Sequence, residues 1–418
     1  MSQLVKKIGA LIFSLLMVVS TLTAIPVSAQ DQVEITYTIW DSRQEPGLRE
    51  IADDFEATNP DIKVNIQVVG WDQYWTMLEA GATGGSLPDV FWMHANEINK
   101  YGEHDMLLGL NEYIEQDGVD LTKFPEGLVN LYNINDVQYA LPKDQDTVGL
   151  WYNKTLFDEA GLEYPNEDWT WDDLFHAAQT LTNKEEDKYG IAFKLSNQEG
   201  FYNFIYQNGG TVIKEDGTSG MDLPETIEGL DFFFNFTREG LSPEIYLDDE
   251  QIQALQNGKA AMAYMGSWLV GLFQENDYLK ENFAVAVLPY KEGHDRIGIY
   301  NGLGNAISAN TQHPEQAWKF VSYLSSQEAQ EKQSRLGVAI SAYEGTEQVW
   351  TESDENYDLS AYIDMMENQV LRPHTKATAI WEQKSYEILR DGYIGARPTE
   401  EVAKETAEMM NDFIRQEP

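Results

Sequence analysis

The 418-residue sequence contains no cysteine. This absence excludes disulfide bonds, thiolate metal ligands and cysteine nucleophiles, and it also excludes a lipid anchor on cysteine. Apart from one apolar stretch near the N-terminus, the chain has no run of about 18 apolar residues, the length that a membrane-spanning helix needs. We therefore expect no membrane-spanning helix in the rest of the chain.

Basic residues are scarce, with 28 lysines and arginines against 70 acidic residues and a net charge of −42. A surface of this sign repels nucleic acid and anionic lipid, so neither is an expected partner. The acidic residues are scattered, without a block of five or more. We interpret them as a solvated coat, for which adaptation to high salt is one explanation, in preference to a metal reservoir.

Motifs of common enzyme and cofactor sites are also missing. The six histidines show neither H-x-x-x-H nor H-E-x-x-H spacing, and no G-x-S-x-G string occurs. Gly302 to Gly304 lacks the third glycine of a dinucleotide fingerprint, and neither a Walker lysine motif nor an EF-hand loop occurs. We expect no metal, no cofactor and no catalysis, although paired carboxylates for glycoside hydrolysis remain an alternative because so many acids form pairs by chance.

The N-terminal 29 residues have the pattern of a secretory signal peptide. Lys6 and Lys7 precede the apolar run Ile8 to Val19, and Val27-Ser28-Ala29 resembles a cleavage site. The alternative is a membrane anchor. The pattern predicts a periplasmic or extracellular protein.

The remaining chain is too long for one ordinary core, so two lobes are expected. Alternating apolar residues predict strands over Val33 to Trp40 and Ile62 to Val68, and a continuous apolar strand follows at Val90 to Met93. Helical patterns separate these strands, around Leu48 to Phe55 and Gln73 to Ala82. This alternation predicts an α/β fold with a mainly parallel sheet, whose ligand lies beyond the carboxyl ends of the strands.

The second half begins with a predicted strand, Thr147 to Tyr152, and becomes more helical. Thr170, with Asp173 three residues on, predicts a capping box at the start of a helix. Ala260 to Met265 has the pattern of a buried strand, and Ile299 to Ser308 that of one strand returning to the first lobe.

Tryptophans at strand ends and after glycine turns indicate a carbohydrate site. Sugars present C–H patches that pack on an indole face, while their hydroxyls require planar polar partners. The tryptophan candidates are Trp40, Trp71, Trp92, Trp268 and, in a helical context, Trp381.

Polar candidates lie beside these tryptophans, because carboxylates and arginine bind hydroxyls with defined geometry. For Arg43 and Asp72, helix capping or simple hydration is an equal alternative. The polar candidates are Arg43, Asp72, His94, Asp144, Asp146 and Asn301, and Tyr202 is a further candidate for the wall of the second lobe, with a core role as its alternative.

Seven segments, in order, resemble those of the family 1 extracellular solute-binding proteins, the group that includes maltose-binding proteins. They are ITYTIWDS, FEATNPDIKV, LPDVFWM, YALPKDQDTVGLWYNKTLFDEAGL, TWDDL, GKAAMAYMGSW, and NGLGNAIS with HPEQAWKFVSYLSS. The resemblance implies a two-lobe periplasmic-binding-protein-like fold of type II, with a ligand cleft between lobes joined by a hinge.

The resemblance also implies residue roles and partners. Trp40, Arg43, Trp71, Asp72, Trp92, His94 and Asn301 would contact the ligand from lobe 1, Asp144 and Asp146 would lie at the hinge, and Trp268 would stack from lobe 2. Tyr202 and Trp381 match the family only loosely. The lobes would comprise residues 30–142 plus 300–342 and residues 143–299 plus 343–418. The expected partners are a sugar and the permease subunits of an ABC importer, the expected state is a monomer, and another polar solute is an alternative ligand.

Overall fold

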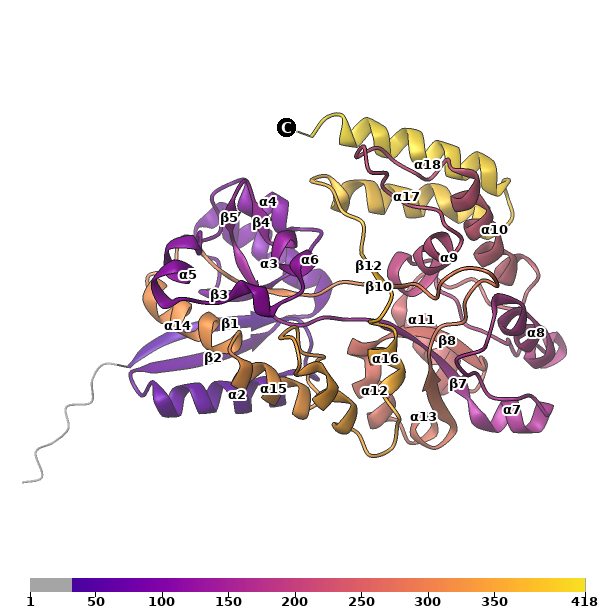
Figure 1. Cartoon of the computed structure of the whole chain (residues 1–418), viewed down its shortest axis with the longest axis horizontal. Coiled ribbons are helices and arrows are strands. Elements are labelled where there is room, and N and C mark those ends of the chain that lie inside the picture. Colours follow the sequence, from indigo (N-terminus) through magenta and orange to yellow (C-terminus); the bar gives the residue numbers. More distant parts are fainter. Residues whose placement is uncertain (1–31, 418) are drawn as a thin grey trace, which may run out of the picture.

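The computed structural model describes residues 32–417, so the predicted signal peptide lies outside the described residues. Two bodies, each built around its own sheet, lie side by side and are joined by several extended segments (Figure 1). We call the body around the five-stranded sheet lobe 1 and the body around the three-stranded sheet lobe 2. Within residues 32–417, no helix combines the length and apolar character needed to cross a membrane.

Lobe 1 contains a mixed sheet of order β2-β1-β3-β11-β6, in which β1 pairs in parallel with β2 and β3, and β11 runs antiparallel to β3 and β6. Its strands and helices are β1 (Val33–Ile39), α2 (Glu45–Thr58), β2 (Ile62–Val68), α3 (Trp71–Gly84), β3 (Val90–Met93), α4 (Ile98–Gly102), α5 (Asn111–Asp117), the 3₁₀ turn Leu121–Lys123, α6 (Glu126–Leu131), β4 (Asn133–Ile134), β5 (Val137–Gln138), β6 (Ala140–Pro142), β11 (Gly304–Ile307), α14 (Pro314–Leu324) and α15 (Gln327–Arg335).

The first three strands agree with the sequence prediction, and β3 shows why its apolar run is continuous. Val90 and Trp92 belong to the core cluster that also contains helices α2 and α14, whereas Phe91 and Met93 belong to the cluster of α3, α4 and α6 on the opposite face. A strand covered on both faces needs apolar residues at every position.

The prediction of a mainly parallel sheet is correct only for β1 to β3, because β11 is antiparallel to its neighbours in lobe 1, and in lobe 2 β7 pairs antiparallel with both β8 and β9. The strands and helices of lobe 2 are β7 (Val148–Asn153), α7 (Lys154–Ala160), α8 (Trp171–Leu181), the 3₁₀ turn Lys184–Glu186, the π-helical turn Asn197–Phe201, α9 (Tyr202–Gln207), α10 (Pro224–Arg238), α11 (Asp248–Gln256), β8 (Met262–Gly266), the 3₁₀ turn Ser267–Leu269, α12 (Val270–Glu275), α13 (Asp277–Asn282), β9 (Phe283–Ala286), the 3₁₀ turn Glu347–Glu352, α16 (Ser360–Asp364), α17 (Thr378–Tyr393) and α18 (Thr399–Ile414).

The capping box predicted at the start of α8 is present. The Thr170 side chain accepts from the backbone N–H of Asp173, and the Asp173 carboxylate accepts from the backbone N–H of Thr170 at 2.8 Å. These bonds satisfy N–H groups that a helix leaves free in its first turn.

Extended segments lie side by side where the lobes meet. Residues 143–146 pair with residues 301–303 through Lys143 N–H to Leu303 C=O (2.7 Å), and with residues 340–341 through Gln145 N–H to Ile340 C=O (3.1 Å). Strands β10 (Gly298–Tyr300) and β12 (Gln369–Leu371) pair in parallel between the two bodies (Figure 1).

The sequence pattern predicted one strand over Ile299 to Ser308, but the structure divides it into β10 and β11. The interruption lies at Asn301 to Leu303, where the backbone is hydrogen-bonded to residues 143–146 and not to a neighbouring strand of the same sheet. The glycine at position 302 permits this close approach, because a Cβ there would lie 2.2 Å from the carbonyl oxygen of Asp144.

Candidate functional site

An aromatic cluster forms one wall of the candidate site on lobe 1. Trp40 follows the end of β1, and its ring meets Trp71 and Trp92 edge to face at centroid distances of 5.0 and 4.9 Å. Tyr74 and Trp75, both from α3, complete the cluster. Trp71 is 46% exposed and Trp92 is 0% exposed, so the cluster runs from a buried base to an open face.

His94 lies beside this wall, with its ring 5.6 Å from that of Trp71. Its Nδ1 lies 3.2 Å from the backbone nitrogen of Asn96, and its Nε2 faces the guanidinium of Arg372 at 3.4 Å. Burial, together with the charge of Arg372, lowers the pKa of His94 well below its usual value. The imidazole is therefore neutral near pH 7.

Asn301 faces His94 across 3.3 Å, between its amide nitrogen and Nε2. Its amide oxygen has no hydrogen-bond partner among residues 32–417. His94 and Asn301 thus form a polar floor next to the tryptophans.

Asp144 and Asp146 have different surroundings. Asp144 is 6% exposed and fully engaged, since Oδ1 accepts from the backbone N–H of Leu303 (2.7 Å) and Oδ2 from Lys143 Nζ (2.7 Å). Asp146 is only half-buried, and its Oδ1 accepts from the Asn301 N–H (2.9 Å) and from Gln198 Nε2 (2.5 Å). Burial, and secondarily the charge of Asp144, raises the pKa of Asp146 to about 7.

Lobe 2 contributes Trp268, which is half-buried at the turn after β8. Its ring covers the backbone of Gly266 so closely that a Cβ at that position would lie 2.1 Å from the indole. The glycine of the GSW segment is therefore needed to set the ring orientation.

Arg43 and Asp72 extend the lobe 1 side. The Arg43 guanidinium pairs with Asp41 at 3.1 Å, and its Cδ lies 3.8 Å from where a Cβ of Gly271 in lobe 2 would stand. Asp72 is exposed in the first turn of α3, where a negative charge is favourable. The structure thus gives Arg43 a place between the lobes and Asp72 a helix-terminal position.

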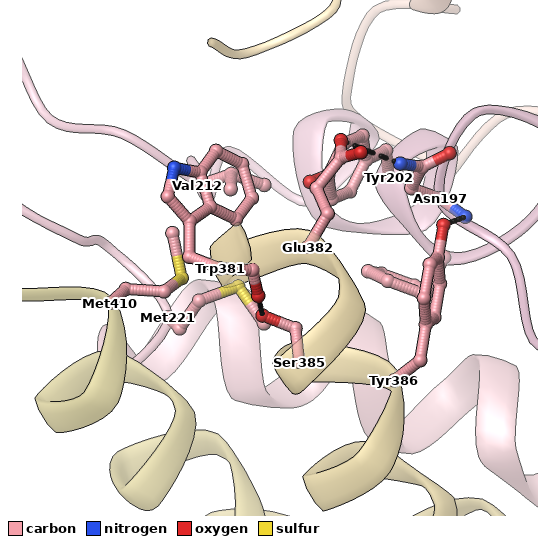
Figure 2. Close-up of a pocket in the computed structure, with 10 residues that line it drawn as sticks. Asn197, Tyr202, Val212, Met221, Trp381, Glu382, Ser385, Tyr386 and Met410 are labelled. Carbon is pink, nitrogen blue, oxygen red and sulfur yellow. Dashed lines mark hydrogen bonds between the residues drawn. The ribbon is translucent and has the colours of Figure 1, made fainter. Parts of the chain in front are cut away.

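Tyr202 and Trp381 lie apart from the tryptophan wall and line a small pocket inside lobe 2 (Figure 2). They are 2% and 1% exposed, and Trp381 donates from Nε1 to Thr375 Oγ1 at 2.8 Å. Met221 and Met410 border the same pocket. With so little exposed surface, both aromatic residues pack in the lobe 2 core in this arrangement, and a role in ligand contact stays a prediction.

Sequence reasoning missed a group of polar residues near the hinge. Arg372 is buried, and its Nη2 donates to both carboxylate oxygens of Glu382 at 2.9 and 2.6 Å. Asn96 and Asn197 donate to the same carboxylate. No short motif links them, although Glu382 directly follows the predicted Trp381. Among the described residues, no cluster of His, Asp and Glu could hold a metal ion.

Residues 40–331 match the model of the bacterial extracellular solute-binding proteins, and this match spans more than half of the chain. The chain belongs to this family. Members of this solute-binding family are binding proteins and not enzymes.

Individual relatives agree with the family match. The chain is 29% identical to a maltotriose-binding protein of Pyrococcus abyssi over 310 residues, which cover 72% of this chain and 64% of the relative. It is 26% identical to a multiple sugar-binding protein of Streptococcus mutans, with 78% of this chain and 80% of the relative covered.

Among solved structures, an ABC substrate-binding protein of Listeria monocytogenes in complex with cycloalternan matches with a TM-score of 0.82 and 28% identity. The match covers 92% of this chain and 99% of the Listeria protein. The solute-binding protein described here therefore has the two-lobe, type II periplasmic-binding-protein fold that its sequence predicted.

Proposed function

We propose that this solute-binding protein is an extracytoplasmic receptor that binds an oligosaccharide between its lobes and delivers it to an ABC importer. The observation that carries the proposal is the open face of the Trp40 and Trp71 wall beside neutral His94 and half-buried Asp146. Indole faces pack on sugar C–H patches, and the polar floor supplies hydroxyl partners.

The named relatives support a sugar as the ligand. The Pyrococcus relative is named a maltotriose-binding protein, and the Streptococcus relative is named a multiple sugar-binding protein. The Listeria structure is a complex with cycloalternan. An oligosaccharide also suits several tryptophans, because each ring can cover one sugar unit.

We propose two groups among the predicted residues. The first would contact the sugar, since its members keep accessible surface, or, for the buried Asn301, an amide oxygen without a hydrogen-bond partner among residues 32–417: Trp40, Arg43, Trp71, Asp72, His94, Asp146, Trp268 and Asn301. The second would support the site from beneath because its members are buried: Trp92, Asp144, Tyr202 and Trp381.

Binding would follow a population shift from an open to a closed arrangement, because only the closed form makes contacts from both lobes. We propose hinge boundaries between residues 142 and 143, 299 and 300, and 342 and 343. The core clusters support the first two boundaries, since Leu141 and Val148 belong to different clusters, as do Ile299 and Tyr300. Secretion by residues 1–29, action as a monomer, and docking of the closed form on a permease complete the proposal.

The test is thermal melting and intrinsic tryptophan fluorescence of residues 30–418 with a panel of oligosaccharides that includes maltotriose and cycloalternan. A ligand at a hundred times its Kd stabilises the folded state by about 2.7 kcal/mol, which a melt resolves. A raised Tm with one sugar class, recovered intact, supports the receptor. Cleaved sugar would indicate a glycoside hydrolase, and no response to any sugar would indicate another polar solute.

A further inference from the structure

The Glu382 carboxylate, on α17, is a meeting point for three segments of the chain. It is 5% exposed and accepts from Arg372 (2.6 and 2.9 Å), Asn197 (2.8 Å) and Asn96 (2.7 Å). Figure 2 shows the bond from Asn197. Burying a carboxylate costs free energy unless it is paired and fully hydrogen-bonded, so the loss of any one donor makes this buried arrangement less favourable.

One of these donors comes from the other lobe. Asn96 follows β3, and its neighbours Ala95 and Ile98 are buried in a lobe 1 core cluster. Trp381, adjacent to Glu382, is buried in a lobe 2 cluster. The bond from Asn96 to Glu382 therefore joins the lobes, and it breaks when they separate.

A second contact joins the same two regions. Glu103, just after α4, forms an ion pair with Lys376, in the segment that leads into α17. Both side chains are mostly covered, with 20% and 32% exposure, so solvent screens this pair less than a fully exposed one. The two contacts thus link the region after β3 to the start of α17.

The same carboxylate also orients a group at the cleft floor. Arg372 Nη1 lies 3.4 Å from His94 Nε2, while Arg372 Nε has no hydrogen-bond partner within residues 32–417. The bidentate bonds to Glu382 fix the plane of the guanidinium beside His94 and Asn301. The Glu382 carboxylate therefore both bonds Asn96 of the other lobe and holds Arg372 in place.

We propose that the Asn96 to Glu382 hydrogen bond and the Glu103 to Lys376 ion pair form a latch that stabilises the closed arrangement. Glu382 acts as a positioning residue, because it holds Arg372 at the floor of the site while Asn96 completes its hydrogen bonds. The sugar arm of the test rests on the proposed function, and the conformational arm does not.

The conformational arm measures the distance between the lobes. Since the chain contains no cysteine, Glu112→Cys on α5 and Glu408→Cys on α18, both exposed positions, accept one spin label each. Double electron–electron resonance should show a population with a short distance between the two spin labels in the parent protein without sugar. In Asn96→Ala/Glu103→Gln this population should fall at least threefold.

Matched controls are Asn65→Ala and Glu79→Gln. They remove a hydrogen bond to Glu34 and an ion pair with Lys100, both inside lobe 1. Asn96→Asp should open the lobes more than Asn96→Ala, because it places a second carboxylate beside Glu382. Equal effects of the two variants would indicate that only the packing of the Asn96 side chain matters, and this result would overturn the latch.

The sugar arm uses maltotriose as the probe. The double variant should bind it about tenfold more weakly through faster dissociation, which is about 1.4 kcal/mol. The sugar-free Tm should stay close to that of the controls, because water replaces the lost donor at Glu382 when the lobes open. Unchanged distances with and without maltotriose, or a Tm several degrees below the controls, would overturn the latch. A shift in distance without maltotriose binding would support the latch and count against an α-glucan ligand.

Discussion

Trp71 shows how one residue combines exposure with a fixed orientation. Its ring is 46% exposed, yet Trp40, Trp75 and His94 hold it edge to face. Trp71→Ala should therefore weaken sugar binding at least tenfold, about 1.4 kcal/mol, and change Tm little. Tyr164→Ala, which removes an exposed aromatic outside the cleft, should leave affinity unchanged in the same calorimetric titration. Equal affinity for both variants would show that Trp71 does not contact the sugar.

Asp146 is the residue at which pH should act. Its pKa lies near 7 in the folded protein against an ordinary 3.8, because burial disfavours the charged form. The folded state then binds the proton more tightly than the unfolded state, so this carboxyl makes the protein less stable as pH rises from about 4 to 7. The isosteric Asp146→Asn variant lacks this loss, and its unfolding free energy relative to the parent should increase between pH 5 and 8.

Urea unfolding at several pH values measures this difference. Asp216→Asn is the control, because hydrogen bonds from Thr218 lower the pKa of Asp216, and its contribution is therefore constant above pH 5. A pH-independent difference for Asp146→Asn would contradict the raised pKa.

At the scale of elements, the turn from β8 into the 3₁₀ segment Ser267–Leu269 depends on Gly266. Its backbone angles suit any residue, with φ −72° and ψ 154°, but a Cβ would overlap the Trp268 ring. Gly266→Ala should turn this ring away, lower sugar affinity and alter the tryptophan emission spectrum. Gly84→Ala, at the end of α3 with only Ser86 nearby, should do neither. Identical binding by both variants would contradict a role for the ring orientation.

At the scale of the whole molecule, the net charge of −42 produces repulsion across the surface. Raising NaCl from 0.1 to 1 M shortens the Debye length from about 10 to about 3 Å, and the folded state should gain stability. Tm should therefore rise across a salt series measured by calorimetry. A falling Tm would show that surface ion pairs such as Lys63 with Glu56 outweigh the repulsion.

Local patterns in the sequence determined the elements of the fold and the family. The structure bears out the predicted strands β1, β2 and β3 and the capping box at Thr170, and the family comparison bears out the ordered family segments. The strands and the capping box depend on residues within about ten positions, where periodicity and capping chemistry act.

Only the tertiary structure decided which candidates are exposed and which are buried. Trp71 and Trp92 both stand near strand ends, yet packing on both faces of β3 buries one, while the start of α3 exposes the other. The carboxylate of Glu382 meets Asn96, 286 positions earlier in the chain. Such partners are invisible to sequence patterns, because they arise from the packing of two lobes and not from the local backbone.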